Sequence, residues 1–252
     1  MKRISRRKLI GSGLAATAGV AGLAAAGKLA ERYGLVPPDC GGVFGPGETL
    51  TYGVQRVLTA HSLAREFPRS MISAAPFANA TDAPGAAFDG LRAGGFADWR
   101  LQVDGLVERP GTYSLADLKG MGRRSQITEI ACEEGWSYIA EWIGTPLTAV
   151  LQAAGMKAEA RYVAYFSIDK GWWDSMDMWD ALHPQTLLAW GMNDGELPVG
   201  FGGPLRMRVP RQLGYKSIKY IARVTATDSM KGFGKGLGSA APEAGYSWYA
   251  GI

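Results

Sequence analysis

The chain has 252 residues, of which 47% are hydrophobic and 20% are charged, a composition typical of a soluble globular protein with one large or two small domains. Its 35 glycines favour a fold rich in strands and turns over a helix bundle. The net charge of +4 does not indicate a nucleic-acid-binding protein. The first eight residues contain five of the 27 basic residues, which leaves 22 basic and 23 acidic residues in the rest.

The N-terminus has the layout of an export signal. Its basic start precedes a Gly- and Ala-rich apolar stretch from Leu9 to about Ala26. The pair Arg6-Arg7 gives this segment a resemblance to signals read by the twin-arginine export machinery, which carries folded proteins, often with a cofactor in place. We therefore expect residues 1–26 to be a twin-arginine signal peptide and the protein to be periplasmic. An uncleaved signal would anchor it to the membrane, and a plain anchor helix is the alternative.

Residues 27–60 are rich in Pro and Gly around VPPDCGGVFGPGE and are interpreted as an N-terminal arm or linker. Residues 61–252 are expected to form one domain. Its first segment, HSLAREFP (61–68), predicts a short helix that ends at Pro68.

From residue 98 onward, hydrophobic periodicity predicts both strands and helices. Alternating or continuous apolar residues predict strands in 98–107, 125–132, 160–169, 204–210 and 216–228. Cap and stop signals predict helices in 114–121, which has a Ser cap, in 145–156, which has a Thr cap and a Gly stop, and in 183–193. Because strands and helices mix without regular alternation, the fold class is α+β rather than doubly wound α/β.

Cys132 lies in ITEIACEEGWSYIAEWIGTPL (127–147) and is one of only two cysteines. It is interpreted as a buried apolar side chain, as a disulfide partner of Cys40, or as a nucleophile or metal ligand. A nucleophile needs a base, and His61 and His183 are both distant in sequence. A structural zinc site needs four ligands, and the paired spacing typical of them is absent. A single thiolate therefore suits a metal only if a cofactor supplies the other ligands.

Four segments, in order, resemble the sulfite oxidase fold family. ITEIACEEGWSYIAEWIGTPLTAVL (127–151) resembles the segment with the molybdenum-ligating cysteine, and the run 183–224 resembles the molybdopterin segment. DWRLQVDGLVERPGTYSLADL (98–118) resembles the entry strand. GYSWYAGI (245–252) resembles the ending of a bacterial exported branch related to the periplasmic methionine sulfoxide reductase catalytic subunit. The resemblance covers about Leu50 to the C-terminus and implies mixed sheets with short helices.

The resemblance implies a molybdenum–molybdopterin cofactor. One pterin supplies two dithiolene sulfurs and the protein one thiolate, which Cys132 matches. Arg206 would grip the pterin phosphate and Lys219 would add a charge. The cofactor-binding residues that it implies are Asn79, Ser167, Arg206, Lys216, Ser217, Ile218 and Lys219. Without the resemblance, KSIKYIARV would be interpreted as an ordinary strand with a solvated basic face.

Some positions depart from the family pattern or extend it. Ile130-Ala131 replaces a His-Asp pair and Gly202 replaces a His or Asn, which affects the polarity of the substrate pocket and one cofactor contact. Glu134 matches an acidic residue of the reductase branch. It is interpreted as a catalytic residue that tunes the metal or relays protons, or as an exposed loop residue.

A tryptophan-rich stretch follows the predicted strand 160–169. Trp172, Trp173 and Trp179 would form a wall at the mouth of the site or would pack in the core. His183 is expected to order a loop or to cap a helix rather than to bind metal.

We therefore expect an exported molybdenum-cofactor oxidoreductase that transfers an oxygen atom to or from a small-molecule S- or N-oxide. No C-x-x-C-H haem motif is present, so a membrane cytochrome b or a soluble cytochrome c would exchange electrons with it. Without the dimerisation domain of sulfite oxidases proper, a monomer is expected. Two alternatives stay open: a cofactor-free binding or scaffold protein that retains the fold, and a thiol-based redox protein with a Cys40–Cys132 disulfide.

Overall fold

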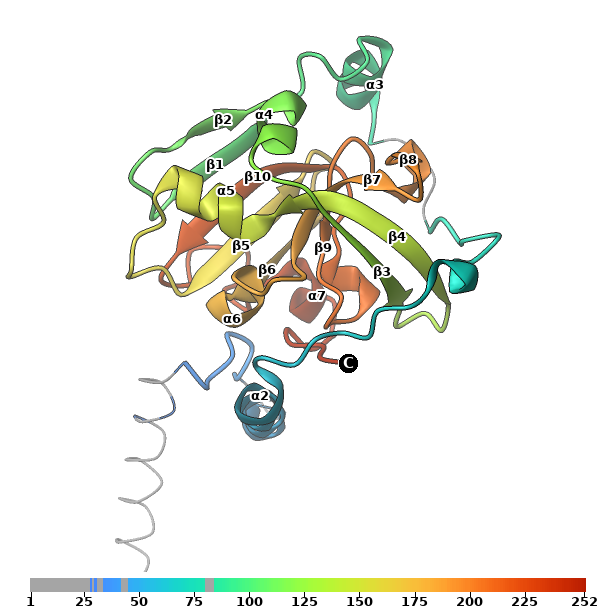
Figure 1. Ribbon diagram of the computed structural model, residues 1–252. Helices are drawn as coiled ribbons and strands as arrows, with labels where there is room; N and C mark the ends of the chain where they lie inside the picture. The colour runs from blue at the N-terminus through green and yellow to red at the C-terminus, as the bar shows by residue number, and fades with distance from the viewer. Residues whose placement is uncertain (1–27, 29, 31–33, 42–44, 80–83) are drawn as a thin grey trace, which may run out of the picture.

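The computed structural model describes residues 28, 30, 34–41, 45–79 and 84–252 (Figure 1). The predicted signal peptide, 1–26, lies outside these residues. Among the described helices, none combines the length and the apolar character that a membrane crossing requires. Two five-stranded sheets with few, short helices make up the fold, which confirms the α+β prediction.

The first sheet joins strands that are far apart in the sequence. Its strand order is β2-β1-β10-β5-β6. The strands are β1 (Leu101–Gly105), β2 (Gly111–Tyr113), β5 (Tyr162–Ser167), β6 (Trp173–Asp177) and β10 (Ile221–Thr227). β1 runs parallel to β10, and the other neighbours are antiparallel. The last strand in the sequence is therefore the central strand of this sheet.

The second sheet is antiparallel and carries the cysteine segment. Its order is β3-β4-β7-β8, and β9 also pairs with β7. The strands are β3 (Arg124–Ala131), β4 (Ser137–Pro146), β7 (Leu187–Met192), β8 (Gly195–Glu196) and β9 (Arg206–Arg208). β3 and β4 form a hairpin whose last pair is Ala131 with Ser137. The hairpin thus places Cys132 in the connection that leaves the sheet.

The helices are α2 (Gly45–Thr59), α3 (Ala86–Ala93), α4 (Leu115–Gly120), α5 (Leu147–Ala154), α6 (Met178–Ala181) and α7 (Ala240–Glu243), with 3-10 turns at Arg69–Met71, Val199–Phe201 and Gly214–Lys216. The predicted Ser cap of α4 is confirmed, because Ser114 and Asp117 form a reciprocal capping box. The Gly stop of α5 is also confirmed, since Gly155 has a left-handed φ of 70°. The Thr cap of α5 is wrong: Thr145 belongs to β4 and donates to the Leu118 carbonyl at 2.6 Å.

Two further helix predictions are wrong. The segment predicted as a helix at 183–193 contains β7, which lies between β4 on one side and β8 and β9 on the other. Pairing on both sides overrides the helical preference of its Leu, Ala and Met residues. Residues 61–68 run extended beside β3, where Phe67 donates its N–H to the Ile127 carbonyl at 2.9 Å. The stretch interpreted as an arm contains a regular 15-residue helix, α2.

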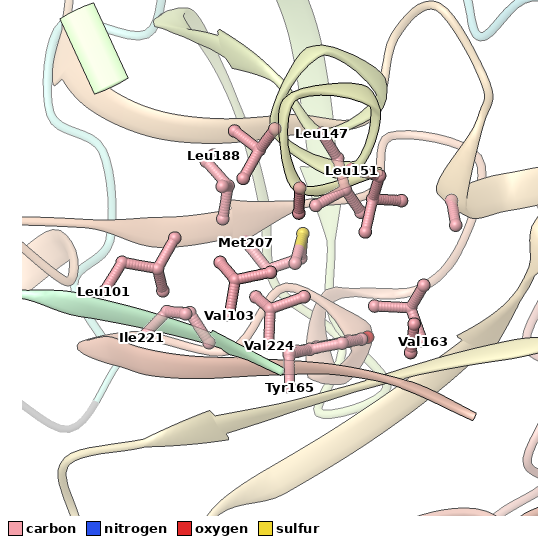
Figure 2. Packing of buried hydrophobic residues seen from close by; sticks show 14 of the residues in the cluster. Leu101, Val103, Leu147, Leu151, Val163, Tyr165, Leu188, Met207, Ile221 and Val224 are labelled. Carbon is pink, nitrogen blue, oxygen red and sulfur yellow. The ribbon is translucent and has the colours of Figure 1, made fainter. Parts of the chain in front are cut away.

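The main core lies between the first sheet, helix α5 and the second sheet (Figure 2). Side chains from the first sheet point toward Leu147 and Leu151 of α5 and toward Leu188 and Met207 of the second sheet. The labelled first-sheet residues are Leu101, Val103, Val163, Tyr165, Ile221 and Val224, all fully buried. Because both sheets pack on one core, the loops that leave the two sheets are held in fixed positions relative to one another.

Candidate active site

A cavity of about 200 Å³ is lined by residues from both sheets. Ile130 on β3 and Arg206 on β9 come from the second sheet, and Ser167 at the end of β5 comes from the first. The cavity brings together eight residues that the sequence predicts for the site: Asn79, Cys132, Glu134, Ser167, Arg206, Ser217, Ile218 and Lys219. Segments up to 140 positions apart therefore meet at one place, although the roles of these residues stay predictions.

Cys132 is held by the turn of the β3–β4 hairpin. Its N–H donates to the Trp136 carbonyl at 2.9 Å, and its carbonyl accepts from Gly135 at 3.1 Å. Gly135 has a φ of 89°, which favours glycine. Gly214 packs against this turn so closely that an added Cβ would lie 3.3 Å from the Ala131 carbonyl oxygen. The cysteine turn and the segment that follows residue 213 therefore form one wall.

The thiol of Cys132 lies among carboxylates. Its Sγ is 3.1 Å from Glu133 Oε2 and 3.9 Å from Glu134 Oε2. Burial, together with these acidic neighbours, raises the pKa of Cys132 to about 12. The thiol is therefore protonated at neutral pH, and binding of a metal by its sulfur would release that proton.

The geometry disfavours the thiol-based alternatives. No disulfide joins Cys40 to Cys132, both of which lie in the described residues. His61 packs its ring on Trp179, and His183 contacts Ser62 and Gln185, so neither histidine is at the cavity. In the described part of the chain, no three His, Cys, Asp or Glu side chains gather to hold a metal ion. A metal bound by Cys132 would need ligands from outside the protein, as the sequence predicts.

Glu134 ties the cysteine turn to the segment before α3. Its Oε2 accepts from Asn79 Nδ2 at 2.9 Å and from Trp136 Nε1 at 2.8 Å. The predicted cofactor residue Asn79 thus directs its amide to Glu134. Glu134 is exposed in the turn, as one interpretation expects, and it also lines the cavity, so its catalytic role stays a prediction.

The part of the cavity wall around Arg206 is basic and buried. Arg206 is 3% exposed and donates to the carbonyls of Phe201 at 2.8 Å and Ser217 at 2.7 Å, while its Nε has no hydrogen-bond partner. Behind it, Arg208 donates to Thr128 Oγ1 at 3.2 Å. Burial lowers the pKa of both, that of Arg208 to about 9, where the nearby Arg206 adds to the effect. Sequence reasoning missed Arg208, although strand alternation places it on the same face as Arg206.

These two guanidinium groups lack acidic partners. Among the ion pairs formed between described residues, none includes Arg206 or Arg208. A buried charge without a counter-charge is unfavourable, and a bound anion would compensate it. The orphaned Nε of a cavity-lining arginine is therefore the observation that fits a phosphate at this wall.

Lys219 lines the same wall. Its Nζ donates to the Gly200 carbonyl at 2.6 Å and to the Asn79 carbonyl. Burial and the nearby Arg206 lower its pKa to about 8. Gly202 has a φ of 104°, and a Cβ there would lie 2.9 Å from Lys219 Cβ. The departure at Gly202 thus makes room for the lysine stem.

The structure places Lys216 away from the cavity. Its side chain is fully buried behind the wall, where the ammonium pairs with Asp174 and donates to the Trp248 carbonyl at 2.8 Å. It does not line the cavity, whereas its neighbour Ser217 does. The geometry therefore does not support a direct contact between Lys216 and a bound phosphate.

The mouth of the cavity carries aromatic side chains. Trp172, which is 62% exposed, lines it, as do Trp136, Tyr215 and Tyr220, which sequence reasoning missed. Trp173 instead stacks on Phe166, and Trp179 lies beside His61. Only Trp172 of the three tryptophans considered from sequence borders this site.

His183 orders a loop, as predicted. Its Nδ1 accepts from the Gln185 N–H at 3.2 Å, and its Nε2 lies 3.2 Å from the Ser62 carbonyl.

Ile130, one of the family departures, is 2% exposed and lines the cavity, so it makes that side apolar.

One soft thiol, a basic wall and an aromatic mouth together fit a metal cofactor that brings its own sulfur ligands and a phosphate. The comparisons with known proteins agree. Residues 91–233 match the model of the oxidoreductase molybdopterin-binding domain family.

The chain is also similar to individual proteins. It is 36% identical over 194 residues to a putative protein-methionine-sulfoxide reductase subunit, YedZ1, of Azospira oryzae, covering 76% of this chain and 69% of the relative. It is 36% identical over 147 residues to the protein-methionine-sulfoxide reductase catalytic subunit MsrP of Xanthomonas campestris, covering 52% of this chain but only 46% of that relative. Among solved structures it resembles the sulfane dehydrogenase SoxCD of Paracoccus pantotrophus, with a TM-score of 0.50 and 25% identity over 52% of this chain and 39% of that one.

Proposed function

Because the chain belongs to the oxidoreductase molybdopterin-binding domain family, we propose that it is an S-oxide reductase whose substrate resembles methionine sulfoxide. The observation that carries the proposal is the meeting of Cys132 with Arg206 and Lys219 in one cavity. The names of the two reductase relatives favour reduction over sulfite oxidation.

The residues of the chain would divide the work of holding the cofactor. Cys132 would be the one protein ligand of the metal, and Arg206, Lys219 and the 217–219 backbone would bind the phosphate. When bound, the molybdenum centre supplies oxygen-atom transfer and a two-electron redox change.

Reduction of an S-oxide takes up two electrons and two protons and gives a thioether and water. Glu133 and Glu134 are the carboxylates nearest the thiol and are placed to hold a proton beside the substrate. A membrane cytochrome b or a soluble cytochrome c would supply the electrons. The aromatic mouth suits a thioether product, since sulfur packs favourably on aromatic rings.

The basic and apolar N-terminal sequence supports export to the periplasm by the twin-arginine route. There, electrons would reach the enzyme from the membrane or from a soluble carrier, and the enzyme would act as a monomer.

Purified protein from a host that makes the cofactor tests this function. We expect about one molybdenum per chain and turnover of methionine sulfoxide with an artificial electron donor. Cys132→Ser should abolish turnover while the circular dichroism spectrum stays unchanged, because the lost group is a metal ligand and not a core side chain.

Each other outcome has a distinct meaning. If sulfite with an electron acceptor were turned over faster than methionine sulfoxide with a donor, the assigned direction of the reaction would be wrong, and the enzyme would oxidise its substrate. A folded wild-type protein without molybdenum would support the cofactor-free binding protein instead. Retained turnover in Cys132→Ser would remove the assigned role of that residue.

A further inference from the structure

Residues 246–252 lie along the back of the cavity wall formed by 214–219. The Leu213 N–H donates to the Ala250 carbonyl at 2.9 Å, and Tyr215 Oη donates to the Ser247 carbonyl at 2.6 Å. The buried ammonium of Lys216 binds the Trp248 carbonyl at 2.8 Å. Three carbonyl acceptors between Ser247 and Ala250 thus hold the segment that lines the cavity with Gly214, Tyr215 and Ser217.

Helix α2 covers the other side of residues 246–252, as their neighbouring positions in Figure 1 also show. The Tyr52 ring packs edge-on against Trp248 and Tyr249 at centroid distances of 5.6 and 5.3 Å. The Arg56 guanidinium lies 4.3 Å from the centre of the Tyr249 ring. Trp248 and Tyr249 are nearly fully buried, and α2 supplies part of the contacts that hold them in place.

Both α2 and residues 246–252 lie outside the region 91–233 that matches the family model. Residues 246–252 reach the cavity wall through the backbone of Leu213 and the side chains of Tyr215 and Lys216. Lys216 connects residues 246–252 to the cavity wall. Its side chain points to Asp174 and Trp248, whereas the next residue, Ser217, faces the cavity.

We propose that α2 and residues 246–252 form a clamp that holds residues 214–219 in the conformation that receives the cofactor phosphate. Tyr249 and Lys216 are its positioning residues. They touch no cofactor and act through the backbone of Ser217 to Lys219. The cofactor role rests on the proposed function, whereas the ordering of 214–219 by the clamp does not.

Hydrogen exchange of the full chain, prepared without cofactor, tests the clamp. Tyr249→Ala removes the ring that joins α2 to the segment but lies away from the cavity. We expect exchange in 211–219 to accelerate roughly tenfold or more, with no change in β1 and β2. Tyr249→Phe keeps the ring and should behave as wild type. Tyr113→Ala, which removes a tyrosine from β2, is the matched control and should leave 211–219 unchanged.

Cofactor retention is the second measurement. After gel filtration, Tyr249→Ala should hold several-fold less molybdenum and pterin than wild type, Tyr249→Phe or Tyr113→Ala. By linkage, loading should slow exchange in 246–252 of the wild type. Unchanged exchange at 211–219 in Tyr249→Ala overturns the clamp. Faster exchange with full retention overturns its role toward the cofactor. A wild-type protein that binds no molybdenum would contradict the proposed function. In that case, the exchange measurement would still decide whether the clamp exists.

Discussion

His183 is a buried histidine whose contacts keep it neutral. Burial, with a smaller effect from Arg211, lowers its pKa from a usual 6.5 to about 4. The unfolded chain takes up a proton near pH 6.5, whereas the folded chain does so only near pH 4. Between these values the unfolded state binds more protons, so stability is lost as the pH falls through this window.

We expect His183→Gln to remove this pH dependence. Urea unfolding of the wild type should lose about 2 kcal/mol between pH 7 and pH 5 from this residue alone, and the variant should lose correspondingly less. The same slope in both proteins would show that His183 does not titrate as its surroundings imply.

Single residues also show how far sequence can predict a site. Cys132 stands out because a chain with two cysteines leaves few alternatives for a soft ligand. Lys216 and Ser217 are adjacent in sequence yet face opposite sides of the wall, which no periodicity reveals in an irregular segment. Arg208 escapes notice because a buried arginine without an acidic partner looks like a surface residue in the sequence.

At the scale of elements, α2 depends on tertiary contacts. Its sequence GPGETLTYGVQRVLT is rich in Gly, Thr and Val, which have low helix propensity, so the sequence alone predicts a linker. The buried Arg56 compensates: its Nε lies 2.6 Å from Asp177 Oδ2, and its Nη2 lies 2.5 Å from Asp180 Oδ2. The helix is therefore fixed by ion pairs more than 120 positions away in sequence.

Arg56→Met should destabilise the protein by about 3 kcal/mol, because the buried Asp177 loses its cationic partner and Asp180 keeps only Arg211. Arg109→Met is the control, since the pair of Arg109 with Glu108 is 3.5 Å long and exposed, and it should cost less than about 1 kcal/mol. Denaturant unfolding at neutral pH compares the two. Equal losses would mean that α2 is not held by this network.

The α4 capping box and the strands β1, β3, β5, β9 and β10 follow from local signals and are confirmed. β7 does not follow from local signals, because it is a strand through pairing with neighbours on both sides rather than through the propensity of its own residues. Local patterns therefore predict elements that carry their own caps or alternation, and they fail where pairing decides.

At the scale of the molecule, the cavity joins both sheets through a wall with unpaired positive charge. Cofactor binding should raise the melting temperature by roughly 5 °C or more over protein made in a host without the cofactor. In Arg206→Met, this difference should shrink, because the variant lacks the guanidinium that would bind the anion, whatever the stability of the cofactor-free form. Calorimetry of the four samples checks this. An undiminished difference would show that Arg206 does not bind the anion.

The central place of β10 also governs when the molecule can fold. β1 with β2 and β5 with β6 are paired neighbours, but nothing joins these two pairs until Ile221–Thr227 enters between them. On the ribosome, this strand emerges after the other described strands. The two halves of the first sheet must therefore wait with open edges until Ile221–Thr227 has been synthesised.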